Sequence, residues 1–517
     1  MVALHGHWHI TATFALDKLI VAHFPHPRNG PTPKAPPLSL RDTTVKETES
    51  VCVLGVMLDS RLKWKVQQAS ALGKATSIVS ALWQITRPSQ GVSLKMICCL
   101  YISVVIPKMT YGLNVWYTPP HCPEGGQKRV GSVSALHRQA LLSITGAMRS
   151  ALTDLLETHA NLLPMRYLLE KICYRSLIRI FSLPDNHPVR KMASNAYRHR
   201  NTTTHSPPLW TLSRLFDLPA PSDVETITPL AHPPDYDVLF SCDIPLDKDQ
   251  AYRREENNRR RINIYSDGSR IDGQAGAAVV LLDKQNPANN QVLRYQLGAL
   301  KLHTTYEAEG IGVVLRLALL QNCLHTNQDN TNMIGLDGKS FIEVTFNFKH
   351  RPRQYIIDEI HRLTDEILTD TSPRLLLTWV PGHMGLDRNE CADEEAKRAA
   401  CGNTGGSSPL PQFLRGKTLP ASVSALKQHF HTSLIKRWEN NFAKSRRLQR
   451  FSIYEPRGVH LNFVHLTDKL SRRQTSVLVQ LHTGHIPLNF HLQHINRSNT
   501  PNCPNCEASG YLAKETV

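Results

Sequence analysis

The sequence predicts a mixed α/β fold, in which helices pack on the faces of a β-sheet. Two observations carry this prediction. Between residues 262 and 400, strand and helix patterns follow one another in the order βββαβααβα. The chain of 517 residues is also 41% hydrophobic, which is enough to bury several cores. At roughly 150 residues per domain, the length corresponds to three or four domains.

Each element of this block follows from local periodicity. Alternating or short apolar runs predict strands over Ile262–Ser266, Ala275–Leu282, Val292–Leu297, Met333–Leu336 and Leu375–Val380. Apolar residues at helical spacing predict helices over Thr304–Asn322, Lys339–Phe346, Gln354–Leu368 and Asn389–Ala400. The polar run Asp267–Arg270 predicts a turn after the first strand.

Outside the block, a strand is predicted over Val51–Leu58 and a helix over Trp64–Thr86, and residues 130–182 are predicted to be helical. The helix over Trp64–Thr86 is expected to bury one stripe formed by Val66, Ala69, Leu72, Ile78 and Leu82. Two stretches rich in Pro, Gly, Ser or Thr predict linkers. These are residues 201–261 and Cys401–Pro411.

Positive charge is concentrated at the two ends of the chain. The net charge is +17 overall, +14 over residues 1–200 and +10 over residues 401–517, whereas residues 201–261 and 262–400 carry −3 and −4. Basic arms attract polyanions, of which nucleic acid is the commonest. A solvated basic surface is the alternative interpretation.

Secreted and membrane classes are disfavoured. The 11 cysteines are odd in number and scattered, which favours a reducing compartment over a disulfide framework. The start of the chain lacks a basic region before its apolar stretch, and the longest apolar run, Met96–Pro107, is too short to span a bilayer. We expect an intracellular protein, nuclear or cytoplasmic, that is not secreted and contacts no membrane.

Four acids fall at informative places on the predicted scaffold. Asp267 ends the first strand, Glu309 lies in the first helix, Asp337 ends the fourth strand and Asp393 lies in the last helix. Four carboxylates without His or Cys between them suit hard divalent cations, Mg²⁺ first. Two such ions can support phosphodiester cleavage. Taken singly, each acid would be read as a solvated or capping residue.

Five short motifs carry a family resemblance. They are Tyr265–Ser269, His303–Glu309, Gly335–Asp337, Trp379–His383 and Asn389–Glu394. In this order, they resemble the successive signatures of a type 1 ribonuclease H domain. The resemblance implies a mixed five-stranded sheet with flanking helices. It also implies endonucleolytic, metal-dependent hydrolysis of the RNA strand of an RNA–DNA hybrid, with two Mg²⁺ ions or with Mn²⁺ in their place.

The resemblance also assigns roles. Asp267 is the carboxylate shared by both metals, and Glu309, Asp337 and Asp393 complete the site. Glu309 is preferred to Glu307 because the family's glutamate follows a small residue, here Ala308.

His383 corresponds to a mobile histidine that assists proton transfer or product release, a role that suits a group titrating near neutral pH. Gly268, Ser269 and Asn389 are candidates for contact with the substrate and its 2′-hydroxyl. Two positions depart from the family: Gly338-Lys339 after Asp337, and Gly310 where Leu is commoner. Glycine costs a helix about 1 kcal/mol relative to Ala.

The N-terminal segment resembles the end of a non-LTR retrotransposon reverse transcriptase. Phe14–Phe24 and Leu54–Asp59 are similar to the last palm strands, and Pro107–Trp116 to the thumb. The family's Tyr-x-Asp-Asp motif would lie upstream of Met1, and the chain contains no Asp-Asp dipeptide. We therefore expect no polymerase activity, and the missing polymerase half of the same polyprotein is a candidate partner.

The C-terminal arm combines cations with aromatic residues, as at Lys436–Trp438 and Arg472-Arg473. This pattern suits phosphate contact and base stacking, or else a solvated helix face. Cys503 and Cys506 resemble half of the retrotransposons' zinc knuckle. Candidate further ligands are His482, His485, His491 and His494.

Five regions follow from these patterns and resemblances. They are a reverse transcriptase palm-end and thumb remnant (1–120), a helical connection (121–200), a Pro/Ser/Thr-rich linker (201–261), a type 1 ribonuclease H domain (262–402) and a basic region with a truncated zinc knuckle (403–517). The rival hypotheses are a catalytically idle nucleic-acid-binding relic and a transposase-like nuclease on the same fold.

Overall fold

The computed structural model of the 517-residue chain describes residues 19–24, 37–40, 43–45, 47–117, 127–201, 208–228, 241–259, 261–326, 333–336, 339–345, 351–370, 376–380, 387–444 and 463–504. The chain forms two compact units. The first unit comprises residues 1–170 and 437–517, and the second comprises residues 171–436. The division falls within helices α7 (Met165–Phe181) and α15 (Val423–Ala443).

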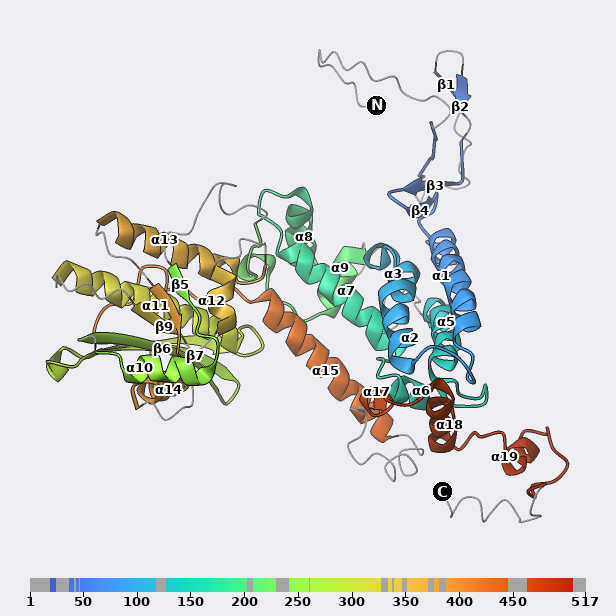
Figure 1. Ribbon diagram of the computed structural model, residues 1–517. Coiled ribbons are helices and arrows are strands. Elements are labelled where there is room, and N and C mark those ends of the chain that lie inside the picture. The colour runs from blue at the N-terminus through green and yellow to red at the C-terminus, as the bar shows by residue number, and fades with distance from the viewer. Residues whose placement is uncertain are drawn as a thin grey trace. The chain divides into compact units, whose positions relative to one another are not determined.

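The second unit is built on a mixed sheet of seven strands (Figure 1). Their order is β11 (Gly405–Gly406), β8 (Gln291–Ala299), β7 (Gln274–Asp283), β6 (Ile262–Ile271), β9 (Met333–Leu336), β10 (Leu376–Trp379) and β5 (Ser241–Asp243). The first four are antiparallel, and β9 runs parallel to β6, β10 to β9 and β5 to β10. The predicted α/β class is confirmed, but the described residues contribute seven strands to this sheet where five are predicted.

The predicted order of elements is confirmed between β6 and α14. After β8 come α11 (Thr305–Thr326), β9, α12 (Lys339–Thr345), α13 (Gln354–Asp370), β10 and α14 (Asp387–Ala400). The two unpredicted strands, β5 and β11, are three and two residues long. Runs this short carry no periodicity that a sequence could reveal. They extend the sheet because each finds a neighbouring strand edge to pair with.

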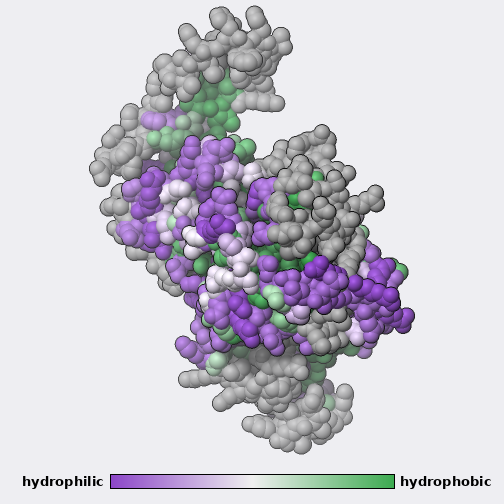
Figure 2. All heavy atoms as spheres, turned by 90° about the vertical axis from the view of Figure 1, so that its left-hand side faces the viewer, coloured by the Kyte–Doolittle hydropathy of each residue, from purple (hydrophilic) through white to green (hydrophobic). Residues whose placement is uncertain are grey.

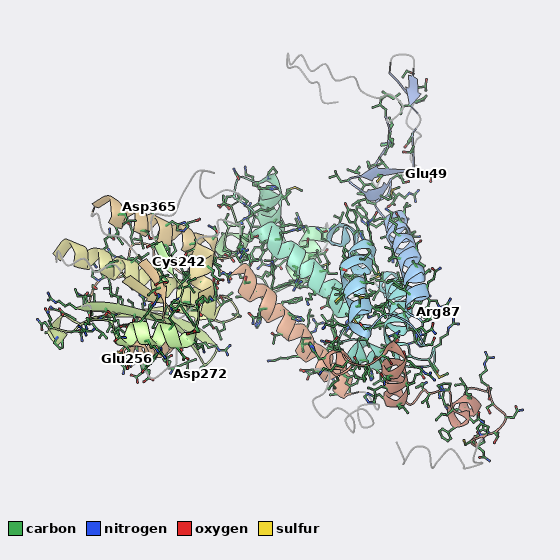
Figure 3. The ribbon with its side chains drawn as sticks, in the orientation of Figure 1. Glu49, Arg87, Cys242, Glu256, Asp272 and Asp365 are labelled. Carbon is green, nitrogen blue, oxygen red and sulfur yellow. The ribbon has the colours of Figure 1, made fainter. Side chains whose placement is uncertain are left out.

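The first strand is longer than the sequence predicts. β6 continues through Asp267 to Ile271, so the prediction that Asp267 ends this strand is wrong. The turn lies instead at Asp272 and Gly273, whose φ angles are 48° and 76° (Figure 3). Asn, Asp and Gly tolerate this left-handed region, which tight hairpins require. The ladder with β7, which pairs Asp267 with Ala278, overrides the turn-like composition of Asp267–Arg270.

Helices cover both faces of the sheet (Figure 1). On one face, Ile264 and Val279 join a core cluster that includes Ile311 of α11 and Ile360 of α13. On the other face, Tyr265 and Val280 pack against Ala392 of α14. The alternation of strand side chains between two apolar layers explains why β7 is an almost unbroken apolar run.

The range 201–261, predicted to be a linker, contributes folded elements to the second unit. Its described residues form α9 (Pro208–Leu215), β5 and α10 (Lys248–Glu256). Leu212 and Phe216 are buried. The Tyr265 hydroxyl donates a hydrogen bond to Glu255 of α10. The few apolar residues of this polar segment are enough to dock it, which composition alone does not show.

The described part of the first unit is mostly helical. Its helices are α1 (Lys65–Ile85), α2 (Leu94–Leu100), η2 (Tyr101–Val105), α3 (Ile106–Met109), α4 (Leu113–Trp116), α5 (Gln127–Thr145), α6 (Thr153–His159), α17 (Phe463–Leu466), α18 (Arg472–Thr483) and α19 (Asn489–His494). The helices predicted over Trp64–Thr86 and within 130–182 are confirmed.

Two hairpins precede these helices. They are β1 (Leu38–Leu40) with β2 (Thr43–Val45), and β3 (Ser50–Val53) with β4 (Val56–Asp59). The single strand predicted over Val51–Leu58 is therefore wrong. Leu54 and Gly55, with φ angles of 50° and 81°, turn the chain back on itself.

The buried face of α1 also differs from the prediction. Gln67, Ala71, Ala75 and Val79 are buried, whereas Val66 of the predicted stripe is 40% exposed. Apolar side chains surround most of this helix, so periodicity could not single out one face. The alanines face the bundle because they let neighbouring helices approach closely.

Two cations of the C-terminal arm are committed to packing in the first unit. The buried Arg472 guanidinium donates to the carbonyl oxygens of Thr86, Ser143 and Ile144, near the ends of α1 and α5. These carbonyls are among the groups that a helix end leaves without partners. Arg437 forms an ion pair with Glu170, with 2.7 Å between Nη1 and Oε2, and Trp438 is buried. The contacts favour a structural role over phosphate contact for these three residues.

No helix among the described residues combines the length and the apolar character needed to cross a bilayer. Hydrophilic side chains cover much of the described surface in Figure 2.

Replacing Arg472 by Ala should lower the free energy of unfolding of the first unit by about 3 kcal/mol, because three buried carbonyls lose a charged donor. Urea unfolding followed by fluorescence measures the change. The matched control is Arg473→Ala at the exposed neighbouring position, which should stay within about 0.5 kcal/mol of the parent. Equal stability of the two variants would contradict the packing role.

Candidate active site

Strand β6 and helix α11 meet backbone to backbone beside Asp267. A Cβ added at Gly268 would lie 2.9 Å from the Ala308 Cβ and would overlap the backbone of Glu309. The close approach continues along the helix, since a Cβ at Gly312 of α11 would lie 3.2 Å from the Ser266 Oγ. The missing side chains let α11 rest directly on β6. Glu309 is thereby brought next to the residue that follows Asp267.

Helix α14 approaches the same strands from the other face. A Cβ added at Gly276 of β7 would lie 2.6 Å from the carbonyl carbon of Ala399. Ala392, Ala396 and Ala399 are completely buried against the sheet. Because Asp393 directly follows Ala392, this seating of α14 positions a third carboxylate over β6.

Lys397 is paired with one of these carboxylates and lies within the electrostatic reach of the other. Its Nζ lies 2.6 Å from Oδ2 of Asp393, one helical turn away. The hydrogen bond and charge of Asp393, and then the charge of Asp267, raise the pKa of Lys397. The charges of both acids therefore act on this one cation. The Asp267 carboxylate is oriented by its own neighbour, since the Gly268 amide donates to Oδ1 at 2.7 Å.

The structure thus brings three of the four predicted acids, Asp267, Glu309 and Asp393, to elements that pack on one strand. Asp337 and His383 lie outside the described residues. Within the part of the chain that is described, no group of three or more His, Cys, Asp or Glu side chains is arranged to hold a metal ion. The donor chemistry fits Mg²⁺ or Mn²⁺, because all four predicted ligands are carboxylates.

The structure describes Gly268 and Ser269 of the candidate substrate-binding residues fully, but only the backbone of Asn389. Gly268 and Ser269 lie in β6, opposite Ala277 and Gly276 of β7. Packing against α11 already accounts for the glycine at 268. Asn389 lies in the first turn of α14, and its side chain is outside the described part of the structure.

Glu307, the rival to Glu309, is engaged in the start of its own helix. Its Oε2 accepts from the Thr304 amide at 2.7 Å, and its own amide donates to the Thr304 hydroxyl at 3.2 Å. This reciprocal pair is a capping box. Burial is the main cause that raises the pKa of Glu307 to about 7, with a smaller contribution from the charge of Glu225. The contacts give Glu307 a structural role, and the choice of Glu309 as ligand stays a prediction.

Glu225 joins this buried region from the segment predicted to be a linker. Its carboxylate accepts from the backbone amides of Arg353 and Val423, which lie at the starts of α13 and α15. Burial raises the pKa of Glu225. One carboxylate therefore caps two helices of the second unit.

Lys397, Gly276 and Glu225 were not singled out from the sequence. Only one of the three carried a signal there. Lys397 carried a usable signal, the i,i+4 spacing from Asp393. Gly276 and Glu225 carried none, because each acts through a segment distant in the chain.

The glycine at position 310 is explained by its neighbours. A Cβ there would lie 2.8 Å from the Phe341 ring and 3.0 Å from Ile356. The ring fills the space that a larger residue on α11 would occupy. The core as built therefore favours glycine at this position.

The histidines considered as zinc ligands contact other groups. His485 Nδ1 and His491 Nε2 lie 2.9 and 3.0 Å from the Ser150 hydroxyl. Nδ1 of His482 lies 3.2 Å from Nε2 of His159. Burial lowers the pKa of His159 to about 4. Cys506 is outside the described residues.

A comparison with known protein families finds none that matches the chain, and a search of curated proteins finds no match either.

Replacing Gly310 by Leu should lower the free energy of unfolding of the second unit by about 2 kcal/mol, since the new side chain overlaps Phe341. Adding Phe341→Ala should recover part of this loss, although Phe341→Ala alone should cost about 3 kcal/mol. Urea unfolding of the parent, both single variants and the double variant gives the coupling. Strict additivity of the two changes would contradict this packing account.

Burial of Glu307 makes stability depend on pH in metal-free buffer. Its folded-state pKa, about 7, lies above the ordinary value of 4.5. The resulting stabilisation is fully present below pH 4.5 and is lost as the pH rises through about 7. Glu307→Gln should therefore flatten the stability profile between these values. Glu343→Gln, at an exposed site, should leave the profile unchanged, and an unchanged profile in both variants would refute the assignment.

Proposed function

We propose that the second unit is a ribonuclease with a type 1 ribonuclease H-like fold, which hydrolyses the RNA strand of RNA–DNA hybrids. One observation carries the proposal. α11 and α14, which carry Glu309 and Asp393, seat closely on β6 and β7 at Gly268 and Gly276, beside the strand that carries Asp267.

The architecture supports the same proposal. The strands β8, β7, β6, β9 and β10 are consecutive neighbours in the sheet, with β5 and β11 added at its edges. β6 and β9 run parallel and pair at Tyr265 and Gly335. In the sequence, Asp267 and Asp337 each follow two residues after this pair. Equal offsets along parallel neighbours favour a shared edge for the two acids.

Asp267, Glu309, Asp337 and Asp393 would hold two Mg²⁺ ions, or Mn²⁺ in their place. When bound, two such ions supply an activated water and stabilise the departing oxygen of the phosphodiester. Lys397 balances the charge of Asp393 at this site. The Gly268 amide keeps the Asp267 carboxylate in a fixed orientation.

The remaining roles follow from the sequence resemblance. His383 moves a proton or assists product release, and Gly268, Ser269 and Asn389 contact the RNA strand and its 2′-hydroxyl. The products carry 5′-phosphate and 3′-hydroxyl ends. The first unit, in this proposal, is a thumb and connection remnant of a non-LTR reverse transcriptase without polymerase activity.

The test offers a labelled RNA–DNA hybrid and Mg²⁺ to the full chain. The parent should cut the RNA strand, and Asp267→Asn should lower kcat by roughly 10³-fold, because one charged group of a preorganised site is removed. Asp272→Asn makes the same chemical change at the hairpin turn of the same strand and should keep the activity of the parent.

Hybrid binding by Asp267→Asn, measured in EDTA, should match that of the parent. Binding without cleavage by any of the three proteins would reject the enzyme in favour of an idle nucleic-acid-binding relic. Cleavage by Asp267→Asn at the rate of the parent would refute the assignment of Asp267 to the active site.

A further inference from the structure

Four cations of the second unit lie together where α7 meets α15. Lys171, Arg175 and Arg179 are spaced four residues apart on α7, a spacing that places them along one face of the helix. Lys427 comes from α15, and the charges of Arg175 and Arg179 both act on it. We call these four residues the cationic stripe.

Stacked aromatic rings hold together the two helices that carry the stripe. The rings of Tyr174 on α7 and Phe430 on α15 are stacked, with centroids 3.7 Å apart and an interplanar angle of 9°. Phe216 meets both rings edge-on, at 5.3 and 5.4 Å. Tyr174 directly precedes Arg175, and Phe430 follows Lys427 by three residues. The two helices therefore hold the cations in a fixed arrangement.

No side chain of the stripe is paired with an acid within the described residues. None of its four side chains forms a hydrogen bond or an ion pair there, although Arg437 and Arg362 elsewhere are paired with Glu170 and Glu359. Glu225 acts on Lys427 electrostatically. Its carboxylate oxygens, however, already accept from two backbone amides.

This arrangement works against folding. Burial, followed by the charge of Arg175, lowers the pKa of Lys171 to about 8. Burial and the charges of Arg175 and Arg179 lower the pKa of Lys427, with Glu225 opposing them. Like charges at i,i+4 destabilise a helix. Lys171 and Lys427 are also half-buried, whereas Arg175 and Arg179 are exposed, and partial burial of the two lysines adds to the cost. A multiply charged anion bound along the stripe would relieve both penalties.

We propose that the cationic stripe binds the phosphate backbone of a nucleic acid duplex. From Lys171 to Arg179 the helix rises about 12 Å. Over such a length a duplex presents several phosphates, since it carries one charge per about 1.7 Å of its axis. A straight row of cations is matched by a polyanion with regularly spaced charge. This role is separate from cleavage, because the stripe shares no residue with the proposed active site.

The test neutralises the stripe in the full chain by combining Lys171→Gln, Arg175→Gln, Arg179→Gln and Lys427→Gln. Fluorescence anisotropy with a labelled RNA–DNA hybrid in EDTA, over a series of salt concentrations, measures binding without cleavage. The affinity should fall at least tenfold. The slope of log K against log[salt] should become shallower by about 0.9 for each phosphate that the variant no longer neutralises.

A matched control removes the same charge from exposed positions of the second unit. It combines Lys191→Gln, Lys248→Gln, Lys301→Gln and Lys417→Gln. The control should change the salt slope far less than the stripe variant does. If both variants changed the salt slope equally, net charge alone would explain the effect and the proposal would be overturned.

Stability separates binding from folding. Removing mutually repelling cations should leave the melting temperature of the stripe variant unchanged or raise it. A melting temperature lowered together with affinity would assign the residues to packing instead. The conservative variant Arg175→Lys with Arg179→Lys should retain hybrid binding.

Two further results identify the class of ligand and show whether the stripe acts separately from the cleavage site. Polyglutamate that displaces the hybrid at equal charge concentration would favour an acidic protein partner and overturn the proposal. At saturating hybrid and Mg²⁺, the stripe variant should keep the kcat of the parent while KM rises. Asp267→Asn should show the opposite, with binding kept and kcat lowered by roughly 10³-fold. Failure of either proposal is therefore recognisable by itself.

Discussion

The candidate site depends on backbone contact between a β-hairpin and two helices. At Gly268 and Gly276 there is no room for a Cβ, because the backbones of Glu309 and Ala399 occupy the space. α11 and α14 consequently approach β6 and β7 from opposite faces without an intervening layer of side chains. A site assembled from three elements requires placement to within a fraction of an ångström. Direct backbone contact offers this, because it removes the freedom of side chains to repack.

How much the sequence could predict depended on the range of the interactions involved. The nine elements from β6 to α14 were predictable, since each has a periodicity of its own. The end of β6 was not, because Asp267–Arg270 has the composition of a turn and only pairing with β7 makes it a strand. The candidate carboxylates were chosen from short motifs, and their role as ligands stays a prediction. Glu225 was not, because its partners, the amides of Arg353 and Val423, are far away in the chain.

The cations also show that the sequence cannot reveal interactions between segments far apart in the chain. Pairs of basic residues near Trp438 and Arg473 suggested phosphate contact, yet Arg437 and Arg472 find partners inside the first unit. The stripe along α7 lacked any sequence signature, because cations four residues apart are common on helices. What distinguishes the two sets is the presence or absence of an acceptor in space. A buried cation with acceptors stabilises a fold, whereas clustered cations without them repel one another and suit an anionic ligand.

The segment before residue 262 is part of the architecture that holds the site. Val224 pairs with Ala421, and the Ser422 amide donates to the carbonyl of Leu302, three residues before the start of α11. Glu225 meanwhile caps α13 and α15. Arg353 at the start of α13 has a φ of 77°, a conformation that costs a non-glycine residue about 1 kcal/mol or more. Its amide hydrogen bond to Glu225 offsets that cost. A fragment limited to 262–402 would lack these interactions at the starts of two of its helices, α13 and α11, the second of which carries Glu309. The folding unit is therefore wider than the range that contains the five short motifs.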